Sequence, residues 1–331
     1  MVNLTTKYMG LTLKNPIIAG SSGLTNKLSD IVELEAQGAG AIVLKSLFEE
    51  EIINEAHDNI NKMQASGFIY PETMDYFDFD EMEDPIANYL KLISDAKKAV
   101  KIPIIASINC VTSNKWPEFA KRIESAGADA LELNVFALPT DLERTAEENE
   151  KVYFDIVSKV TGLVSIPVSI KISQYNTALG SFIKRLSDTP IKSIVLFNRF
   201  YSPDFDIHNF DFNSTTVFST PAELSLPLRW VAIMANRVNC NLAASTGIHD
   251  GYGVVKALLA GADVVQVAST LYRNGFGHIG VMLKQIDEWM SEKGYKSIDD
   301  FKGKMSQSKS HNPAAFERVQ FMKFFRDRGQ K

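Results

Sequence analysis

The chain has 331 residues, of which 45% are hydrophobic and 23% are charged, with 19 Gly, 12 Pro and 2 Cys. This composition excludes a disordered, collagen-like or disulfide-stapled protein, and the net charge of -5 argues against nucleic acid as a partner. The first residues lack an apolar signal core, and no stretch approaches the roughly 20 apolar residues that cross a bilayer, so we expect a cytoplasmic protein with no membrane partner.

One joint between a helix and a strand recurs along the chain. In Gln37–Leu44, Ala126–Leu133 and Ala260–Val267, a helix stop at Gly leads directly into an apolar strand. A second form, in Lys101–Ile105 and Ser165–Ser169, uses Ile-Pro to begin the strand. These joints predict that helices and strands alternate.

The predicted elements begin with a small hairpin over Asn3–Lys14. Eight short apolar runs then predict strands: Pro16–Ala19, Ala41–Leu44, Ile104–Ile108, Ala130–Leu133, Val168–Ile172, Ser193–Phe197, Asn241–Ala244 and Val264–Val267. Segments with helical periodicity lie between and after them: Ser29–Gln37, Pro85–Val100, Pro117–Ala126, Ala146–Val160, Ala178–Ser187, Glu223–Asn236, Gly251–Ala260 and Phe276–Lys293.

Strict alternation predicts parallel strands covered by helices, and eight units favour a closed (β/α)₈ barrel, a TIM barrel of the α/β class, with the hairpin plugging its bottom. A doubly wound open sheet is the alternative. Its G-x-G-x-x-G fingerprint is absent, because Gly20 to Gly23 has the wrong spacing. We therefore prefer the barrel, over residues 1–305.

Two further segments fall outside the repeating units. Phe48–Asp84 is an acidic insertion after the second strand, and such insertions serve as lids, as subunit contacts or, most often at this charge, as solvated surface. Residues 306–331 form a basic extension whose Phe316, Val319 and Phe324 predict an amphipathic helix that packs on the barrel or on a second subunit.

Polar residues follow every predicted strand, at the barrel end where the chemistry of this fold gathers. They are Ser21 and Ser22, Lys45 and Ser46, Asn109, Asn134, Lys171, Asn198, Ser245 and Thr246, and Ser269 and Thr270. Any one could simply hydrogen-bond a loop, but a lysine is costly to bury without an anion or an electron-rich ring beside it. The small residues after the last two strands suit a phosphate, although ordinary helix capping would also explain them.

Several of these segments together are similar to a known family. Asn15–Gly23, Leu44–Ser46, Leu131–Asn134, Ile170–Lys171, Asn198, Ser245–Ile248 and Gly261–Ser269 resemble the dihydroorotate dehydrogenase family, which comprises FMN-dependent barrels of pyrimidine synthesis. Gly294–Gly303 resembles the ending of the soluble class 1 members.

The resemblance implies FMN as cofactor, a small-molecule substrate and a homodimer. By position, it assigns the flavin ring and ribityl chain to Ser21, Ser22, Gly23, Lys45, Ser46, Asn134 and Lys171, and the phosphate end to Thr246, Gly247, Ala268 and Ser269. Lys171 would lie at the N1/O2 edge and stabilise the reduced ring. Lys45, Asn134 and Asn198 would also contact the substrate as catalytic residues while hydride passes to flavin N5.

The departures from the family pattern lie on the substrate side. The family's Cys or Ser base is missing, because its usual position is Ala137, after Phe136. Arg199 follows Asn198 where a small residue is usual, and Ser219-Thr220 replaces a glycine pair. The substrate-reading loop after the second strand has no clear counterpart in Asn61–Gly67. The flavin side is largely intact.

Other residues offer weaker candidates. Cys110 could act as a substitute base, although a buried apolar role is more common, and the five histidines have no metal-binding spacing. Arg199 and Arg229 could meet a carboxylate substrate, although Arg229 is expected on a helix. Three functions follow: a dihydroorotate-oxidising enzyme, an FMN oxidoreductase with a different substrate, and a non-catalytic flavin-binding redox or assembly subunit.

Overall fold

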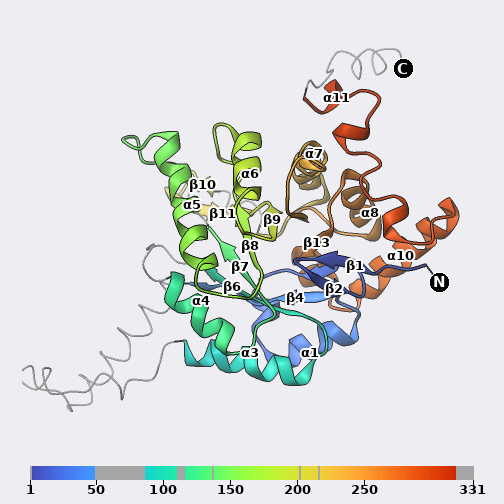
Figure 1. The fold of residues 1–331 in the computed structure, drawn as a ribbon, viewed down its shortest axis with the longest axis horizontal. Helices are drawn as coiled ribbons and strands as arrows, with labels where there is room; N and C mark the ends of the chain where they lie inside the picture. Colours follow the sequence, from blue (N-terminus) through green and yellow to red (C-terminus); the bar gives the residue numbers. More distant parts are fainter. Residues whose placement is uncertain are drawn as a thin grey trace, which may run out of the picture.

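The computed structural model describes residues 2–48, 86–109, 116–135, 138–200, 203–214 and 217–317. Within them, eight parallel strands close into a barrel surrounded by helices (Figure 1), because β4 pairs with β6 and β3 pairs with β13. These strands are β3 (Ile17–Ala19), β4 (Ala41–Val43), β6 (Ile104–Asn109), β7 (Ala130–Asn134), β8 (Val168–Ile172), β9 (Ser193–Leu196), β12 (Asn241–Ser245) and β13 (Val264–Val267). The predicted (β/α)₈ barrel is confirmed.

The predicted helices follow the strands in the expected order, and α9 is an additional short helix that was not predicted. They are α1 (Leu28–Ala36), α3 (Ala87–Ala99), α4 (Trp116–Ser125), α5 (Ala146–Thr161), α6 (Leu179–Ser187), α7 (Ser225–Met234), α8 (Gly251–Ala260), α9 (Ser269–Asn274), α10 (His278–Lys293) and α11 (Ala314–Glu317). Short 3₁₀ helices are η1 (Gly23–Thr25), η4 (Pro221–Leu224), η5 (Ile298–Asp300) and η6 (Gln307–Lys309). The predicted glycine stop is seen at Gly261, whose φ of 119° caps α8 in the left-handed conformation.

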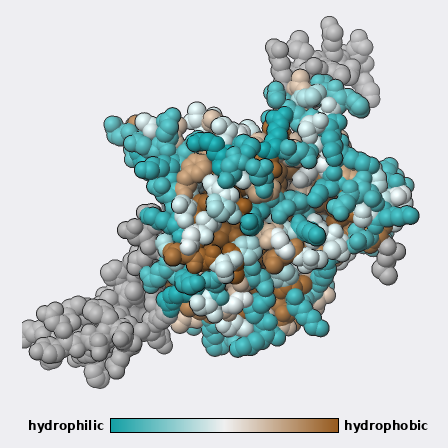
Figure 2. Space-filling model, viewed as in Figure 1, coloured by the Kyte–Doolittle hydropathy of each residue, from teal (hydrophilic) through white to brown (hydrophobic). Residues whose placement is uncertain are grey.

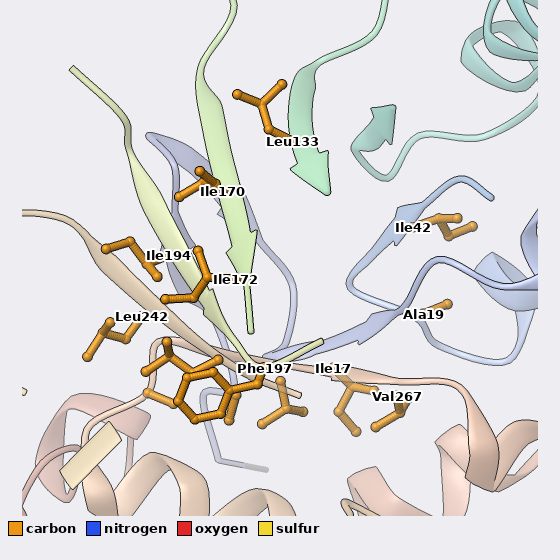
Figure 3. Packing of buried hydrophobic residues seen from close by; sticks show 14 of the residues in the cluster. Ile17, Ala19, Ile42, Leu133, Ile170, Ile172, Ile194, Phe197, Leu242 and Val267 are labelled. Carbon is orange, nitrogen blue, oxygen red and sulfur yellow. The ribbon is translucent and has the colours of Figure 1, made fainter. Parts of the chain in front are cut away.

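Outward-facing strand residues make the core between the barrel and its helices. Ile17, Ile42, Leu133, Ile170 and Leu242 alternate with inward-facing neighbours and are buried against the helical layer. Figure 3 shows such side chains projecting from successive strands. Because both strand faces are covered, these runs read as continuously apolar in the sequence.

The N-terminal hairpin closes the bottom of the barrel, as predicted. Its strands are β1 (Thr6–Tyr8) and β2 (Leu11–Leu13), and it lies across the near face in Figure 1. Tyr8, Met9 and Leu13 are buried inside the barrel, and the N–H of Met9 donates to Asn241 Oδ1 at 2.9 Å. Hydrophilic residues cover most of the same face in Figure 2. The hairpin therefore seals one end, which leaves the carboxyl ends of the strands as the mouth.

Two strand pairings were not expected from the sequence. β5 (Leu47–Phe48) pairs with β6 beside the ring, and β10 (Pro203–Asp206) pairs with β11 (Asp211–Ser214) as a hairpin between β9 and η4. The hairpin strands are rich in Asp and poor in β-branched residues, and β10 is mostly solvent-exposed, so neither periodicity nor propensity marks them.

Some predictions concern residues that the structure does not describe. The acidic insertion falls almost wholly within 49–85, and most of the C-terminal extension falls within 318–331. Where the extension is described, Phe316 packs against the core on the outside of the barrel, and Gln307 Nε2 donates to Glu317 Oε1 at 2.7 Å. In the described segments, no helix combines the length and apolar character required to traverse a membrane.

Candidate active site

The barrel interior changes from apolar to polar toward the carboxyl ends of the strands. Next to the hairpin, inward-facing residues form an apolar cluster that includes Val43, Ile105, Ala130, Ala243 and Val264. Because side chains alternate along a strand, the residue two positions later also faces inward. Those residues form a polar layer, which consists of Lys45, Ser107, Glu132, Ser245 and Gln266.

A cavity with a volume of about 200 Å³ opens above the polar layer, at the mouth of the barrel. It is the position at which barrels of this kind bind their ligands. The structure brings most of the predicted site residues into its lining: Ser21, Asn134, Lys171, Asn198, Thr246, Gly247, Ala268 and Ser269. They come from six different strand ends, so only the closed barrel assembles them.

Four predicted cofactor residues do not line this cavity directly. Ser46 is buried behind the wall, where its Oγ lies 3.1 Å from Ser21 Oγ and 2.8 Å from Ser107 Oγ. Ser22 caps η1 through a hydrogen bond from Leu24 N–H (3.3 Å), and Gly23 begins that turn. Lys45 lies just beyond the carboxyl end of β4 and is half-buried. Ser46 thus supports the wall, while Ser22 shapes the turn after β3.

Asn134 presents an unsatisfied acceptor at the cavity. Its amide nitrogen lies 3.4 Å from Ser46 Oγ, while its Oδ1 is buried and accepts no hydrogen bond from any described residue. A buried polar atom without a partner is costly unless a ligand or water completes it. Asn134 is paired in register with Lys171 of β8, so an acceptor and a cation stand side by side. This pair suits a heterocycle that carries N–H and carbonyl groups on one edge.

Lys171 is held from below by two residues of the polar layer. Its Nζ donates to Gln266 Oε1 at 3.0 Å and lies 4.0 Å from Glu132 Oε1, and Gln266 Nε2 donates to Glu132 Oε2 at 2.5 Å. Burial raises the pKa of Glu132, whereas Lys171 and the Gln266 hydrogen bond lower it. The lysine therefore has a carboxyl neighbour in the chain, so a bound ligand is not the only group that can compensate its charge.

The ends of β12 and β13 form a cradle of small residues. Thr246 and Gly247 have φ of 83° and 77°, so the chain turns sharply as it leaves β12. In the part of the chain that the structure describes, the N–H groups of Gly247, Ile248, Ser269 and Thr270 donate to no protein acceptor. Unpaired N–H groups at the ends of adjacent strands can donate hydrogen bonds to the oxygens of a phosphate group.

The sequence suggested that Arg199 could bind a substrate carboxylate. In the structure, its guanidinium group is paired with groups of the chain. Its Nε donates to Glu223 Oε1 at 2.8 Å, and its Nη1 donates to the Val217 carbonyl at 2.9 Å. The Arg199 and Thr220 contacts lower the pKa of Glu223 against the effect of its partial burial. Arg199 thus ties the end of β9 to the segment that leads into η4, and the carboxylate it meets is in the chain.

Two residues that the sequence analysis gave no role, Glu132 and Gln266, belong to the site, and Ser219, which it noted only in place of a glycine pair, lines the cavity. Gln266 contacts Lys171 and Glu132. The sequence feature that could have identified Glu132 and Gln266 is a polar residue at an inward-facing position of an otherwise apolar strand. Ser219 lines the cavity, donates its N–H to Ser269 Oγ (3.0 Å), and lies 3.1 Å from His249 Nε2. His249 follows the β12 turn, and burial lowers its pKa, so it acts here as a neutral hydrogen-bonding partner.

Other expectations cannot be placed. Cys110, Phe136 and Ala137 lie outside the described residues, as does Asn61–Gly67. Among residues that are described, no three His, Cys, Asp or Glu side chains come together in a way that could hold a metal ion.

Comparison with known proteins identifies the family. The family model described as dihydroorotate dehydrogenase matches residues 3–290. The chain belongs to the dihydroorotate dehydrogenase family. It is 25% identical to the dihydroorotate dehydrogenase B (NAD(+)) catalytic subunit of Thermoplasma volcanium, over 92% of this chain and 98% of that one. It is 24% identical to the same subunit of Pyrococcus furiosus, over 91% and 98% of the two chains.

A second kind of relative is similar over most of the chain. The chloroplastic dihydropyrimidine dehydrogenase (NADP(+)) of Arabidopsis thaliana is 21% identical over 91% of this chain and 76% of that one. As a member of the dihydroorotate dehydrogenase family, the chain is an oxidoreductase of the group that acts on CH–CH bonds. At these identities, the substrate is a separate question.

Proposed function

We propose that this chain is an FMN-dependent oxidoreductase that withdraws a hydride and a proton from a dihydropyrimidine-like ring, with dihydroorotate as the first candidate substrate. The observation that carries the proposal is the composition of one cavity. Asn134 and Lys171 stand at one side of it, and unpaired N–H groups of the β12 and β13 ends stand at the other. Together they match the edge of the flavin ring and the phosphate group of FMN.

The residues present fit FMN. The phosphate would be held by Thr246, Gly247, Ala268 and Ser269. The unpaired N–H groups in this region would donate to the phosphate oxygens, and the small side chains leave space for them. Ser21, Asn134 and Lys171 would hold the ring and ribityl chain, with Ser46 behind them and Ser22, Gly23 and Lys45 nearby. Bound FMN would supply hydride acceptance, which no protein side chain offers.

Asn134, Asn198 and Lys45 would orient the substrate above that ring. The Asn198 N–H donates to Ile172 O (2.9 Å), and the Asn198 amide lies 3.4 Å from the Lys171 carbonyl, so its side chain is held between β8 and β9 at the cavity. The proposal includes the homodimer and the cytoplasmic location expected from the sequence. Light scattering of the purified protein tests the dimer.

The missing base favours a second candidate, an FMN oxidoreductase of this family with a different substrate. Ala137 cannot accept a proton, and Arg199, which lines the cavity, is paired with Glu223 of the chain. Without that base, the substrate proton would pass to water, and the loss of a general base slows proton transfer by about 10²–10⁴-fold. A substrate with a more acidic C–H would need the base less.

Anaerobic mixing with reductants tests the two candidates. We expect dihydroorotate to bleach the visible absorbance of the FMN-loaded protein slowly but completely. Bleaching by dihydrouracil and not by dihydroorotate would support the different-substrate candidate. If dithionite alone bleached the flavin and no dihydropyrimidine did, the chain would be a non-catalytic flavin-binding subunit.

Restoring a proton acceptor is expected to speed this reaction. Ala137→Ser, or Ala137→Cys, should raise the rate of flavin reduction by dihydroorotate about tenfold or more, a part of the 10²–10⁴-fold that a general base contributes. Stopped-flow absorbance measures the rate. Phe136→Ser is the matched control, since it adds the same hydroxyl one position away and should give no gain. Equal rates for all three proteins would count against dihydroorotate as the substrate.

A further inference from the structure

A buried carboxylate lies directly beneath the cavity. Glu132 of β7 has a side chain that is 1% exposed, and it does not line the cavity itself. Gln266 of β13 bridges it to Lys171 of β8, since the Gln266 amide donates to Glu132 (2.5 Å) and its carbonyl oxygen accepts from Lys171 (3.0 Å). Side chains from β7, β13 and β8 thus connect the buried carboxyl group of Glu132 to the ammonium group of Lys171 at the cavity.

The surroundings of Glu132 leave its charge coupled to Lys171. Tyr8 of the hairpin and Tyr89 of α3 also face it, and the pKa of each hydroxyl is raised by burial and by the Glu132 charge, so both stay neutral. Among the described residues, Lys171 is the one cation within ion-pair distance of Glu132. Glu132 Oε1 accepts no hydrogen bond from a described residue, so Lys171 is the group that compensates the charge on that oxygen.

We propose that Glu132 is a positioning residue of the cofactor pocket, which holds Lys171 through Gln266 and sets how much positive charge Lys171 presents to bound FMN. The inference rests on the proposed function for its cofactor. Reduction adds negative charge at the flavin, and an unopposed ammonium beside the ring favours it. An ionised Glu132 offsets that ammonium, whereas a protonated Glu132 does not.

The test is the pH dependence of the two-electron midpoint potential of the FMN-loaded protein, compared with Glu132→Gln. The variant mimics the protonated carboxyl at every pH. We expect the two potentials to agree at the acidic end of the range. Toward alkaline pH, the wild-type midpoint potential should fall about 30 mV below that of the variant. For a two-electron reduction, this difference corresponds to about a tenfold smaller equilibrium constant for reduction of the wild type. The proposal would be overturned if the two midpoint potentials changed in parallel with pH. It would also be overturned if the equilibrium constants for reduction differed by less than about threefold at every pH.

Two further variants separate this role from a structural one. Ser193→Ala removes another buried polar group of the barrel interior, and it should leave the potential unchanged. In a Lys171→Met background, Glu132 has no cation and should hold its proton, so adding Glu132→Gln should not change the potential. A purely structural glutamate would have the same effect in both backgrounds.

A measurement without cofactor distinguishes failure of this inference from failure of the proposed function. Because burial raises the pKa of Glu132, the folded state binds its proton more tightly than the unfolded state does between the ordinary value near 4.3 and the raised value. Wild-type stability should therefore fall as pH rises through that window. The Tm of apo Glu132→Gln, relative to wild type, should rise over the same window. A constant Tm difference would contradict the inference whether or not FMN binds.

Discussion

Gly247→Ala should abolish most FMN binding while the barrel still folds. A Cβ at this position would overlap the backbone of Leu224 and lie 2.7 Å from the Glu223 carbonyl carbon, and φ at Gly247 is +77°. Backbone atoms cannot give way as a flexible side chain could, so the turn after β12 must move. That movement misdirects the Gly247 and Ile248 N–H groups that would bind the phosphate.

The expected loss in FMN affinity is about 100-fold, because two hydrogen bonds to a charged group contribute about 3 kcal/mol or more together. Quenching of FMN fluorescence measures it. The matched control is Gly294→Ala at the end of α10, where φ is +73° and no atom lies within 4 Å of the position that a methyl group would take. This control should cost about 1–2 kcal/mol of stability and leave the affinity unchanged. Equal affinity losses in both variants would remove the phosphate assignment.

Lys171→Met should slow flavin reduction by about 10²–10³-fold, the range seen when one preorganised electrostatic group is removed from an active site. The change keeps an unbranched side chain that is one atom shorter, and it deletes the charge that contacts Gln266 and faces the cavity. The midpoint potential should fall as well. Anaerobic stopped-flow absorbance, with the substrate that bleaches wild type, gives the rate.

Lys192→Met is the control for Lys171→Met. Lys192 directly precedes β9 at the opposite end of the barrel and is exposed, so its loss should change the rate less than threefold. A Lys171→Met protein that reduces its flavin at the wild-type rate would show that the cation at the cavity takes no part in the chemistry.

The architecture could be predicted because its main signal is local. Each strand is short and mostly apolar, as in Ile104–Asn109, and most of the strands are preceded by a glycine or proline joint that the sequence displays directly. The hairpin β10–β11 gave no such signal. Its strands are held by pairing with each other, from Pro203 with Ser214 to Asp206 with Asp211, rather than by a buried apolar face.

The site could be predicted only in part, because strand ends are visible in a sequence and contacts across the barrel are not. Asn134, Lys171 and Gly247 follow from their positions after apolar runs. The Glu132–Gln266 contact joins residues 134 positions apart, and Arg199 meets Glu223 only because the chain returns after the β10–β11 hairpin. Charge compensation inside a barrel depends on such closures, so the sequence alone could not show that Lys171 and Arg199 also have partners in the chain.

Titration of the cofactor-free protein with FMN tests the central claim most directly. We expect one FMN bound per chain with a yellow, fluorescence-quenched complex. The bound cofactor should also stabilise the fold by about 2.7 kcal/mol at a hundredfold excess over Kd, which raises Tm. A chain that quenches no fluorescence and melts at the same temperature with and without FMN would contradict the account.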